Sequence, residues 1–166
     1  MVGSHRVEMA IAAEDKGVAE LVPGSSPYDH IINAVVRAAR SVYAHLGPGR
    51  LEQVYQKMLA DGLTELGLDV AVEPAIPLVV DGRRYRWLYP DLVVDGSLVV
   101  ECKAVDGWLR DADLAQVLTY LAVCQLPVGM LINFGLPRLE YRRTLAPRRP
   151  EQWIRRVAPY LRQRRW

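Results

Sequence analysis

The chain has 166 residues, of which 51% are hydrophobic and 24% charged, a composition typical of one globular domain. Its two cysteines and three scattered histidines form no C-x-x-C pair or zinc-binding pattern, which argues against a disulfide framework and a structural zinc site. The net charge of +2 hides a division, because residues 138–166 hold ten arginines and two glutamates, a net +8, which leaves −6 for the rest.

The two ends of the chain differ from its middle. Charged residues interrupt every apolar run in residues 1–27, so we expect a loosely ordered leader there, neither a signal peptide nor a membrane anchor. No run approaches the roughly 18 apolar residues of a membrane helix. A cytoplasmic location follows as an expectation. The basic tail, residues 146–166, suits either an anionic partner or a solubilising helix, and charge alone does not separate the two.

Helical periodicity dominates the first part of the expected domain, residues 28–145. Apolar residues recur at helical spacing over residues 28–46, and the Gly47-Pro48-Gly49 segment ends that helix. A second helix is predicted over residues 50–66, with Gly67 as its stop.

The period then changes to two, which predicts strands over residues 76–80, 84–89, 92–94 and 98–102. Asp81-Gly82 and Asp95-Gly96 mark turns between them. A third helix is expected over residues 111–124, a fully buried strand over 128–133, a further strand over 139–144, and a last helix that opens at Pro150 and that Pro159 ends or kinks. This order predicts an α/β or α+β sandwich.

The residues best suited to catalysis or metal binding lie on either side of the Asp95-Gly96 turn. Strand alternation places Glu101 and Lys103 on one face and turns the Cys102 side chain into the core. Two carboxylates and an ammonium group at the end of an apolar hairpin need a partner, and a hard cation such as Mg²⁺ is one. A water activated by such a cation can attack a phosphodiester. The alternative is an ordinary hairpin with a solvated salt bridge.

A shared metal makes a demand on the turn. A plain two-residue loop would pair Asp91 with Val100, so that Asp91 and Glu101 would face opposite sides of the sheet. We therefore predict a three- or five-residue loop, or a bulge, which sets Asp91 opposite Glu101.

Two helix edges supply further candidates. Glu52 and Tyr55 share an edge of the second helix, and Gln116 and Tyr120 repeat the arrangement on the third. For each pair the alternative is a polar edge that flanks a core-facing stripe.

Together these residues resemble the signature of the GxxExxY proteins, a family within the PD-(D/E)xK nuclease-like superfamily. The name's glycine, glutamate and tyrosine correspond to Gly49, Glu52 and Tyr55 in the run LGPGRLEQVY. The resemblance covers residues 28–143 and continues through Pro90-Asp91, Glu101-Cys102-Lys103-Ala104, Ala115-Gln116, Tyr120-Leu121 and the run GMLINFG at residues 129–135.

The resemblance implies a restriction-endonuclease-like core, a central mixed sheet flanked by helices. It implies that Asp91, Glu101, the Cys102 backbone carbonyl and Glu52 bind Mg²⁺, with Mn²⁺ as a substitute. Lys103 would orient the attacking water or stabilise the transition state. The residues expected to support the site or contact nucleic acid are Gln116, Tyr120, Tyr55, Arg142 and Arg143.

The function so implied is hydrolysis of phosphodiester bonds in nucleic acid, with DNA favoured over RNA. The alternatives are a non-catalytic nucleic-acid-binding module of the same fold, or a protein that uses the hairpin and the basic tail to dock a partner. The presence of Asp91, Glu101 and Lys103 together favours the enzyme.

Overall fold

The computed structural model describes residues 26–161, so nearly all of the leader expected at residues 1–27, and the last five residues of the tail, lie outside them. The four helices of the described part are α2 (Asp29–Leu46), α3 (Glu52–Glu65), α4 (Asp111–Cys124) and α5 (Pro150–Leu161). Its strands are β1 (Val70–Val72), β2 (Ile76–Val80), β3 (Arg83–Leu88), β4 (Leu92–Val94), β5 (Leu98–Lys103), β6 (Val128–Asn133) and β7 (Glu140–Leu145).

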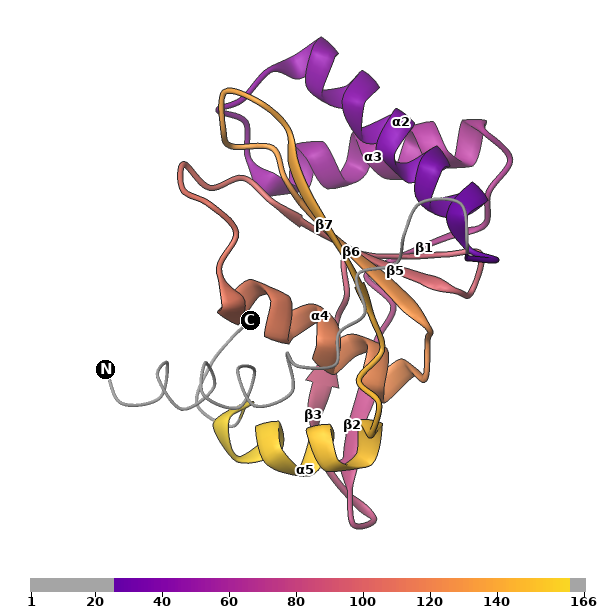
Figure 1. Cartoon of the computed structure of the whole chain (residues 1–166), viewed down its shortest axis with the longest axis vertical. Coiled ribbons are helices and arrows are strands. Elements are labelled where there is room, and N and C mark those ends of the chain that lie inside the picture. The colour runs from indigo at the N-terminus through magenta and orange to yellow at the C-terminus, as the bar shows by residue number, and fades with distance from the viewer. Residues whose placement is uncertain (1–25, 162–166) are drawn as a thin grey trace.

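A five-stranded mixed sheet in the order β1-β4-β5-β6-β7 forms the centre of the fold. Strands β5 and β6 run parallel and are connected through α4, whereas every other neighbouring pair is antiparallel. Strands β2 and β3 form a separate hairpin. Helices flank both faces of the sheet (Figure 1), which confirms the fold class predicted from the sequence.

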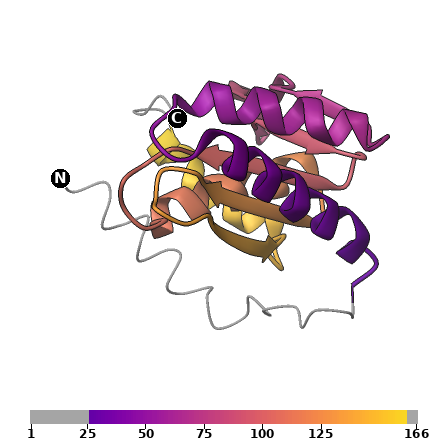
Figure 2. The same cartoon turned by 90° about the horizontal axis from the view of Figure 1, so that it is seen from above.

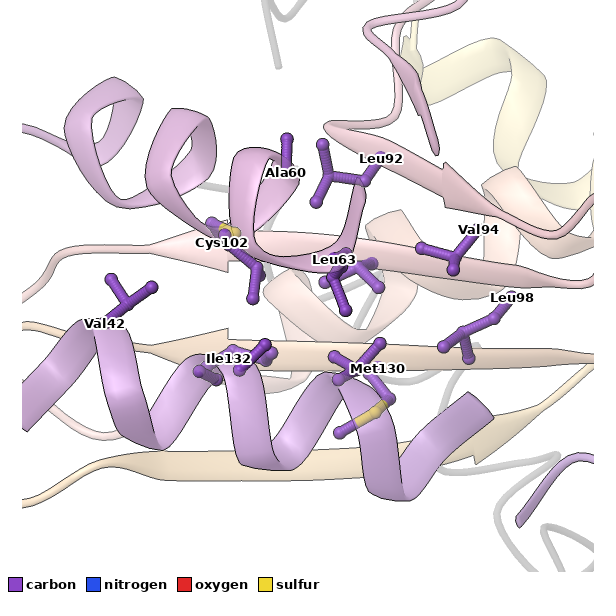
Figure 3. Close-up of a cluster of buried hydrophobic side chains, with 14 of the residues drawn as sticks. Val42, Ala60, Leu63, Leu92, Val94, Leu98, Cys102, Met130 and Ile132 are labelled. Atoms are coloured by element: carbon purple, nitrogen blue, oxygen red, sulfur yellow. The ribbon is translucent and has the colours of Figure 1, made fainter. Parts of the chain in front are cut away.

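The α2–α3 pair covers one face of the sheet. Viewed from above, the two helices lie side by side over the strands (Figure 2). Alternate residues of β4, β5 and β6 point into this core (Figure 3), because successive strand residues face opposite sides of the sheet. Its labelled members from these strands are Leu92, Val94, Leu98, Cys102, Met130 and Ile132.

The opposite face is covered by α4, with α5 and the β2–β3 hairpin packed around that helix. Val99 of β5 and Leu131 of β6 supply the sheet side of this second core. Strand β6 is therefore covered on both sides, and all six of its residues are buried. The apolar sequence of residues 128–133 is the expected signature of such a strand.

One feature differs from the sequence expectations: the three-residue edge strand β1 was not predicted, and it pairs with β4. Of the two effects predicted for Pro159, an end or a kink, the structure excludes an end at the preceding residue, because Pro159 lies inside α5, which continues to Leu161. The helix is held by tertiary packing, because the Trp153 side chain is fully buried and Val157 is 3% exposed.

Candidate active site

The β4–β5 hairpin places Asp91 opposite Glu101. Leu92 pairs with Val100 and Val94 with Leu98, so three residues, Asp95 to Ser97, form the connection. This confirms the predicted longer loop. Gly96 sits there with φ 56, a left-handed conformation that suits glycine. One residue before β4, the Oδ2 atom of Asp91 accepts a hydrogen bond of 2.6 Å from the Cys102 backbone N–H.

Glu101 and Lys103, on strand β5 of this hairpin, form an ion pair. The Lys103 Nζ atom lies 2.7 Å from Glu101 Oε1, and the two side chains are 15% and 3% exposed. The second carboxyl oxygen, Oε2, is buried and has no hydrogen-bond partner within the described residues. A buried carboxyl oxygen without a partner is costly. One acceptor of the site is therefore left for a hydrogen-bond donor or a cation to satisfy.

The pKa values of Glu101 and Asp91 are both raised. Burial, together with the charge of Asp91, raises the pKa of Glu101 to about 8. Burial also raises the pKa of Asp91 to about 6, although the Cys102 N–H and the Lys103 charge oppose that shift. Both carboxyl groups hold their protons more tightly than in water, because burial disfavours their charged forms and one lysine does not offset the negative charge gathered here.

Glu52 is the first residue of α3 and adds to this negative charge. Its side chain is half-buried, and its charge raises the pKa of both Asp91 and Glu101. The structure thus brings Glu52 near the predicted pair from the opposite layer of the fold. Sequence reasoning identified this residue only by its edge position and by the family resemblance.

Glu73 is an acidic neighbour that the sequence did not reveal. It follows β1 with φ 46, and its backbone N–H donates to the Asp91 carbonyl at 2.9 Å. Gln56, which is 5% exposed, donates from Nε2 to Glu73 Oε1 at 3.3 Å and to the Asp91 carbonyl at 3.4 Å. These contacts fix the backbone of Asp91. No local pattern marks Glu73, because the pairing of β1 with β4, two segments far apart in sequence, brings it to the site.

A hard divalent cation fits the donor set, although the described residues contain no preassembled cluster of three His, Cys, Asp or Glu ligands. Carboxylate oxygens are what such cations prefer, and the unpartnered Glu101 Oε2 is one. Cys102 offers no thiolate: burial, reinforced by the charges of Asp91 and Glu101, raises the pKa of its thiol well above the usual range. Its side chain lies in the α2–α3 core.

Gln116 and Tyr120 of α4 lie on the same side of the sheet as Glu101. Gln116 Nε2 donates to the Tyr120 hydroxyl at 2.9 Å, and that hydroxyl donates to the Tyr89 carbonyl at 3.3 Å. Burial and then the charge of Glu101 raise the pKa of Tyr120 above its ordinary value, so the phenol stays protonated. The two side chains brace the backbone two residues before Asp91.

Tyr55, Arg142 and Arg143 are bonded to residues other than Asp91, Glu101 and Lys103. The fully buried Tyr55 donates to the Gly47 carbonyl at 2.6 Å and accepts from the Arg50 N–H at 3.0 Å, so it fixes the turn before Glu52. Arg143 forms an ion pair with Asp29 at 2.9 Å, on the α2 side of the sheet. Arg142 is more exposed and lies 3.7 Å from Glu140.

Comparison with known proteins agrees with the fold. A family model described as the PD-(D/E)XK nuclease superfamily matches residues 29–144. The chain therefore belongs to the PD-(D/E)XK nuclease superfamily. It is similar to the crystal structure of SSO0001, at 15% sequence identity and a TM-score of 0.53, over 97% of this chain and 85% of that one. At that identity the likeness shows the fold alone.

A search of curated proteins gave no match. Within residues 26–161, no helix has the length and apolar character needed to cross a membrane.

Proposed function

We propose that this chain is a Mg²⁺-dependent nuclease that hydrolyses phosphodiester bonds in nucleic acid, with DNA as the favoured substrate. The observation that carries the proposal is the buried Glu101–Lys103 pair beside Asp91, in which one carboxyl oxygen has no partner among residues 26–161. Membership of a nuclease superfamily supports the reaction class. The run from Gly49 to Tyr55 supports placing the chain among the GxxExxY proteins within it.

Asp91 and Glu101 would hold the cation, assisted by Glu52 and the Cys102 carbonyl. The Cys102 N–H already bonds to Asp91, and the N–H and C=O of one strand residue point to the same neighbouring strand, which favours a role for that carbonyl. When bound, Mg²⁺ or Mn²⁺ supplies positive charge against the phosphate and lowers the pKa of an attacking water.

Lys103 is the one cation that the hairpin itself brings to the carboxyl pair. Its ammonium group now lies against Glu101, and it would stabilise the negative charge that develops on the phosphate in the transition state. Gln116 and Tyr120 would keep Asp91 in place through the Tyr89 carbonyl.

Exposed Arg142 is the better placed of the two β7 arginines for contact with a phosphate backbone. Arg143 is committed to Asp29, and we assign it to stabilising the contact between α2 and β7. Free thiols at Cys102 and Cys124 agree with the reducing cytoplasmic location that we also propose.

The proposal is tested by incubating the purified chain with labelled single- and double-stranded DNA and RNA in Mg²⁺, Mn²⁺ or EDTA. We expect cleavage with either metal and none in EDTA, with DNA cut in preference to RNA. Asp91→Asn should abolish cleavage, whereas Asp61→Asn, a matched change at an exposed ion pair with Lys57, should leave it intact. Tight binding without cleavage under every condition would replace the enzyme with a binding module, and no binding at all would favour a protein-docking role.

A further inference from the structure

An exposed tryptophan stands beside the proposed catalytic strand. Trp108 lies in the loop between β5 and α4, five residues after Lys103, and 61% of its surface is exposed. The Arg138 guanidinium carbon lies 5.8 Å from the centre of its ring, in cation–π contact. Arg138 comes from the connection between β6 and β7, so two loops far apart in sequence meet at this ring.

The position of these loops follows from the sheet. Strands β5 and β6 are parallel, and Lys103 pairs with Asn133 at their C-terminal ends. The loops that follow the two strands therefore begin at the same end of the sheet. Figure 1 shows the β5–α4 loop and the β6–β7 connection at that end of the sheet. The Trp108–Arg138 pair thus lies on the side of the molecule where Asp91, Glu101 and Lys103 are placed.

Buried polar contacts hold the loop in this position. The Asn133 side chain, 0% exposed, accepts hydrogen bonds from the Val105 and Gly135 N–H groups and donates to the Gly107 carbonyl at 2.9 Å. A Cβ atom on Gly135 would lie 2.2 Å from the Val105 carbonyl oxygen, so only glycine permits this approach. The Asn133-Phe134-Gly135 segment therefore holds the loop that carries Trp108 in a fixed position.

The residue after Trp108 is fixed as well. Leu109 is 3% exposed, and its N–H donates to the Glu140 carboxylate at 3.1 Å. Trp108 is thus presented outward between an anchored Gly107 and an anchored Leu109. The contacts of Gly107 and Leu109 hold the loop on both sides of the exposed ring, and tryptophan is a residue that is enriched at binding interfaces.

We propose that the Trp108–Arg138 pair is a stacking subsite for an unpaired base of the nucleic-acid strand that is cut, an inference that rests on the proposed nuclease function. An indole ring stacks on any base, because every base has a π-face, and an arginine beside it adds attraction for the strand. Bases inside a duplex have both faces covered by their neighbours. The subsite therefore selects single-stranded segments or frayed ends without reading their sequence.

A second exposed tryptophan provides the matched control. Trp87 is 41% exposed on β3, with the Arg84 guanidinium carbon 5.1 Å from its ring centre. It follows Arg86 and precedes the buried Leu88, so its side chain faces away from the α4 core, on the β2–β3 hairpin. The two pairs have the same chemistry, and only Trp108 sits on the loop that follows the catalytic strand.

The test measures the affinity of a fluorescent single-stranded oligonucleotide and of its duplex in Mg²⁺, in a Lys103→Ala background that slows cleavage. Trp108→Ala should weaken single-strand binding about tenfold, the scale of one lost stack. Trp108→Tyr should retain most of the affinity, and duplex binding should not change. Trp87→Ala should leave both affinities as they were.

The outcomes separate this inference from the proposed function. If the wild-type chain cuts nucleic acid in Mg²⁺ while Trp108→Ala binds single strands as tightly as its parent, the subsite is overturned and the nuclease stands. Equal losses on duplex and single strand, or an equal loss from Trp87→Ala, would also overturn it. If the wild-type chain neither binds nor cuts any nucleic acid, the nuclease proposal fails and the subsite fails with it.

Discussion

The main electrostatic cost of the site is the burial of the Glu101 carboxyl group. It is 2% exposed and bonds to Lys103 through one oxygen, whereas the other oxygen has no partner in the described part of the chain. A structural salt bridge at this depth would usually have both carboxyl oxygens satisfied, because an ion pair repays its desolvation only with further hydrogen bonds. We infer that the metal-free state is the less stable form of the site.

This inference predicts a pH dependence of stability. Burial and the charge of Asp91 raise the pKa of Glu101 from 4.5 to about 8, so between these values the folded chain holds a proton that the unfolded chain releases. In EDTA, the free energy of unfolding should therefore fall as pH rises from about 5 to about 8. Asp91, with its pKa raised to about 6, adds a loss of the same sign over the lower part of that range.

Thermal unfolding at pH 6 and pH 8 checks this expectation. In EDTA the midpoint temperature of wild-type unfolding should be lower at pH 8 than at pH 6. For Glu101→Gln the difference between the two midpoint temperatures should be smaller, because a side-chain amide does not titrate in this range. Added Mg²⁺ should raise the wild-type midpoint more at pH 8, where it competes with fewer protons. Parallel pH profiles for the two proteins in EDTA would contradict the electrostatic account.

Some of the residues at the site were accessible from sequence and others were not. Asp91, Glu101 and Lys103 flank a recognisable turn, so strand alternation and a register argument predict their meeting. Gln116 and Tyr120 are four apart on one helix and form the hydrogen bond that this spacing allows. Glu73 reaches Asp91 because the three-residue strand β1 pairs with β4, and no periodicity is detectable over so short an element.

At the scale of elements, α5 combines a basic surface with a packed inner side. Charge alone leaves open whether the C-terminal segment suits an anionic partner or a solubilising helix, and α5 also carries Trp153 on its inner side, fully buried against α4. The Trp153 Nε1 atom donates to the Thr119 hydroxyl at 3.1 Å. Ile154 and Val157 lie in the same core, so the inner side of α5 is packed whatever its arginines bind.

Trp153→Ala should therefore destabilise the fold, by about 3–5 kcal/mol, because it opens a cavity and leaves the Thr119 hydroxyl without this donor. Urea unfolding monitored by circular dichroism measures the change. Trp87→Ala, which removes a half-exposed ring of the same size, serves as the control and should cost much less. A loss below about 1 kcal/mol for Trp153→Ala would mean that α5 is an independent tail.

The packing of Trp153 against α4 also matters for an experiment that removes the C-terminal segment. A chain that ends after Thr144 loses the α5 surface that covers α4, so any fall in nucleic-acid affinity would mix unfolding with lost phosphate contacts. Substitution of exposed arginines such as Arg148 and Arg149 keeps the buried side of the helix. Their contribution to binding would appear as a shallower dependence of affinity on salt.

Across the whole molecule, the site lies where both layers of the fold reach one end of the sheet. The α2–α3 layer supplies Glu52 and Gln56, the sheet supplies Asp91, Glu101 and Lys103, and the α4 layer supplies Gln116 and Tyr120. Composition and periodicity predicted the layers, because each core-facing stripe is apolar. They could not predict which helix edges approach each other, since that depends on how the two layers pack.

One measurement tests the central claim most directly: the cleavage rate of the wild-type chain against Lys103→Ala on the same labelled strand in saturating Mg²⁺. Lys103→Ala frees Glu101 from its ion pair, so metal and nucleic-acid binding should persist, while cleavage should fall about a hundredfold or more with the loss of one transition-state contact. Lys57→Ala, at an exposed lysine paired with Asp61, should cut at the wild-type rate. If wild type and Lys103→Ala bind the strand equally and neither cuts it, or both cut it at the same rate, the catalytic account is wrong.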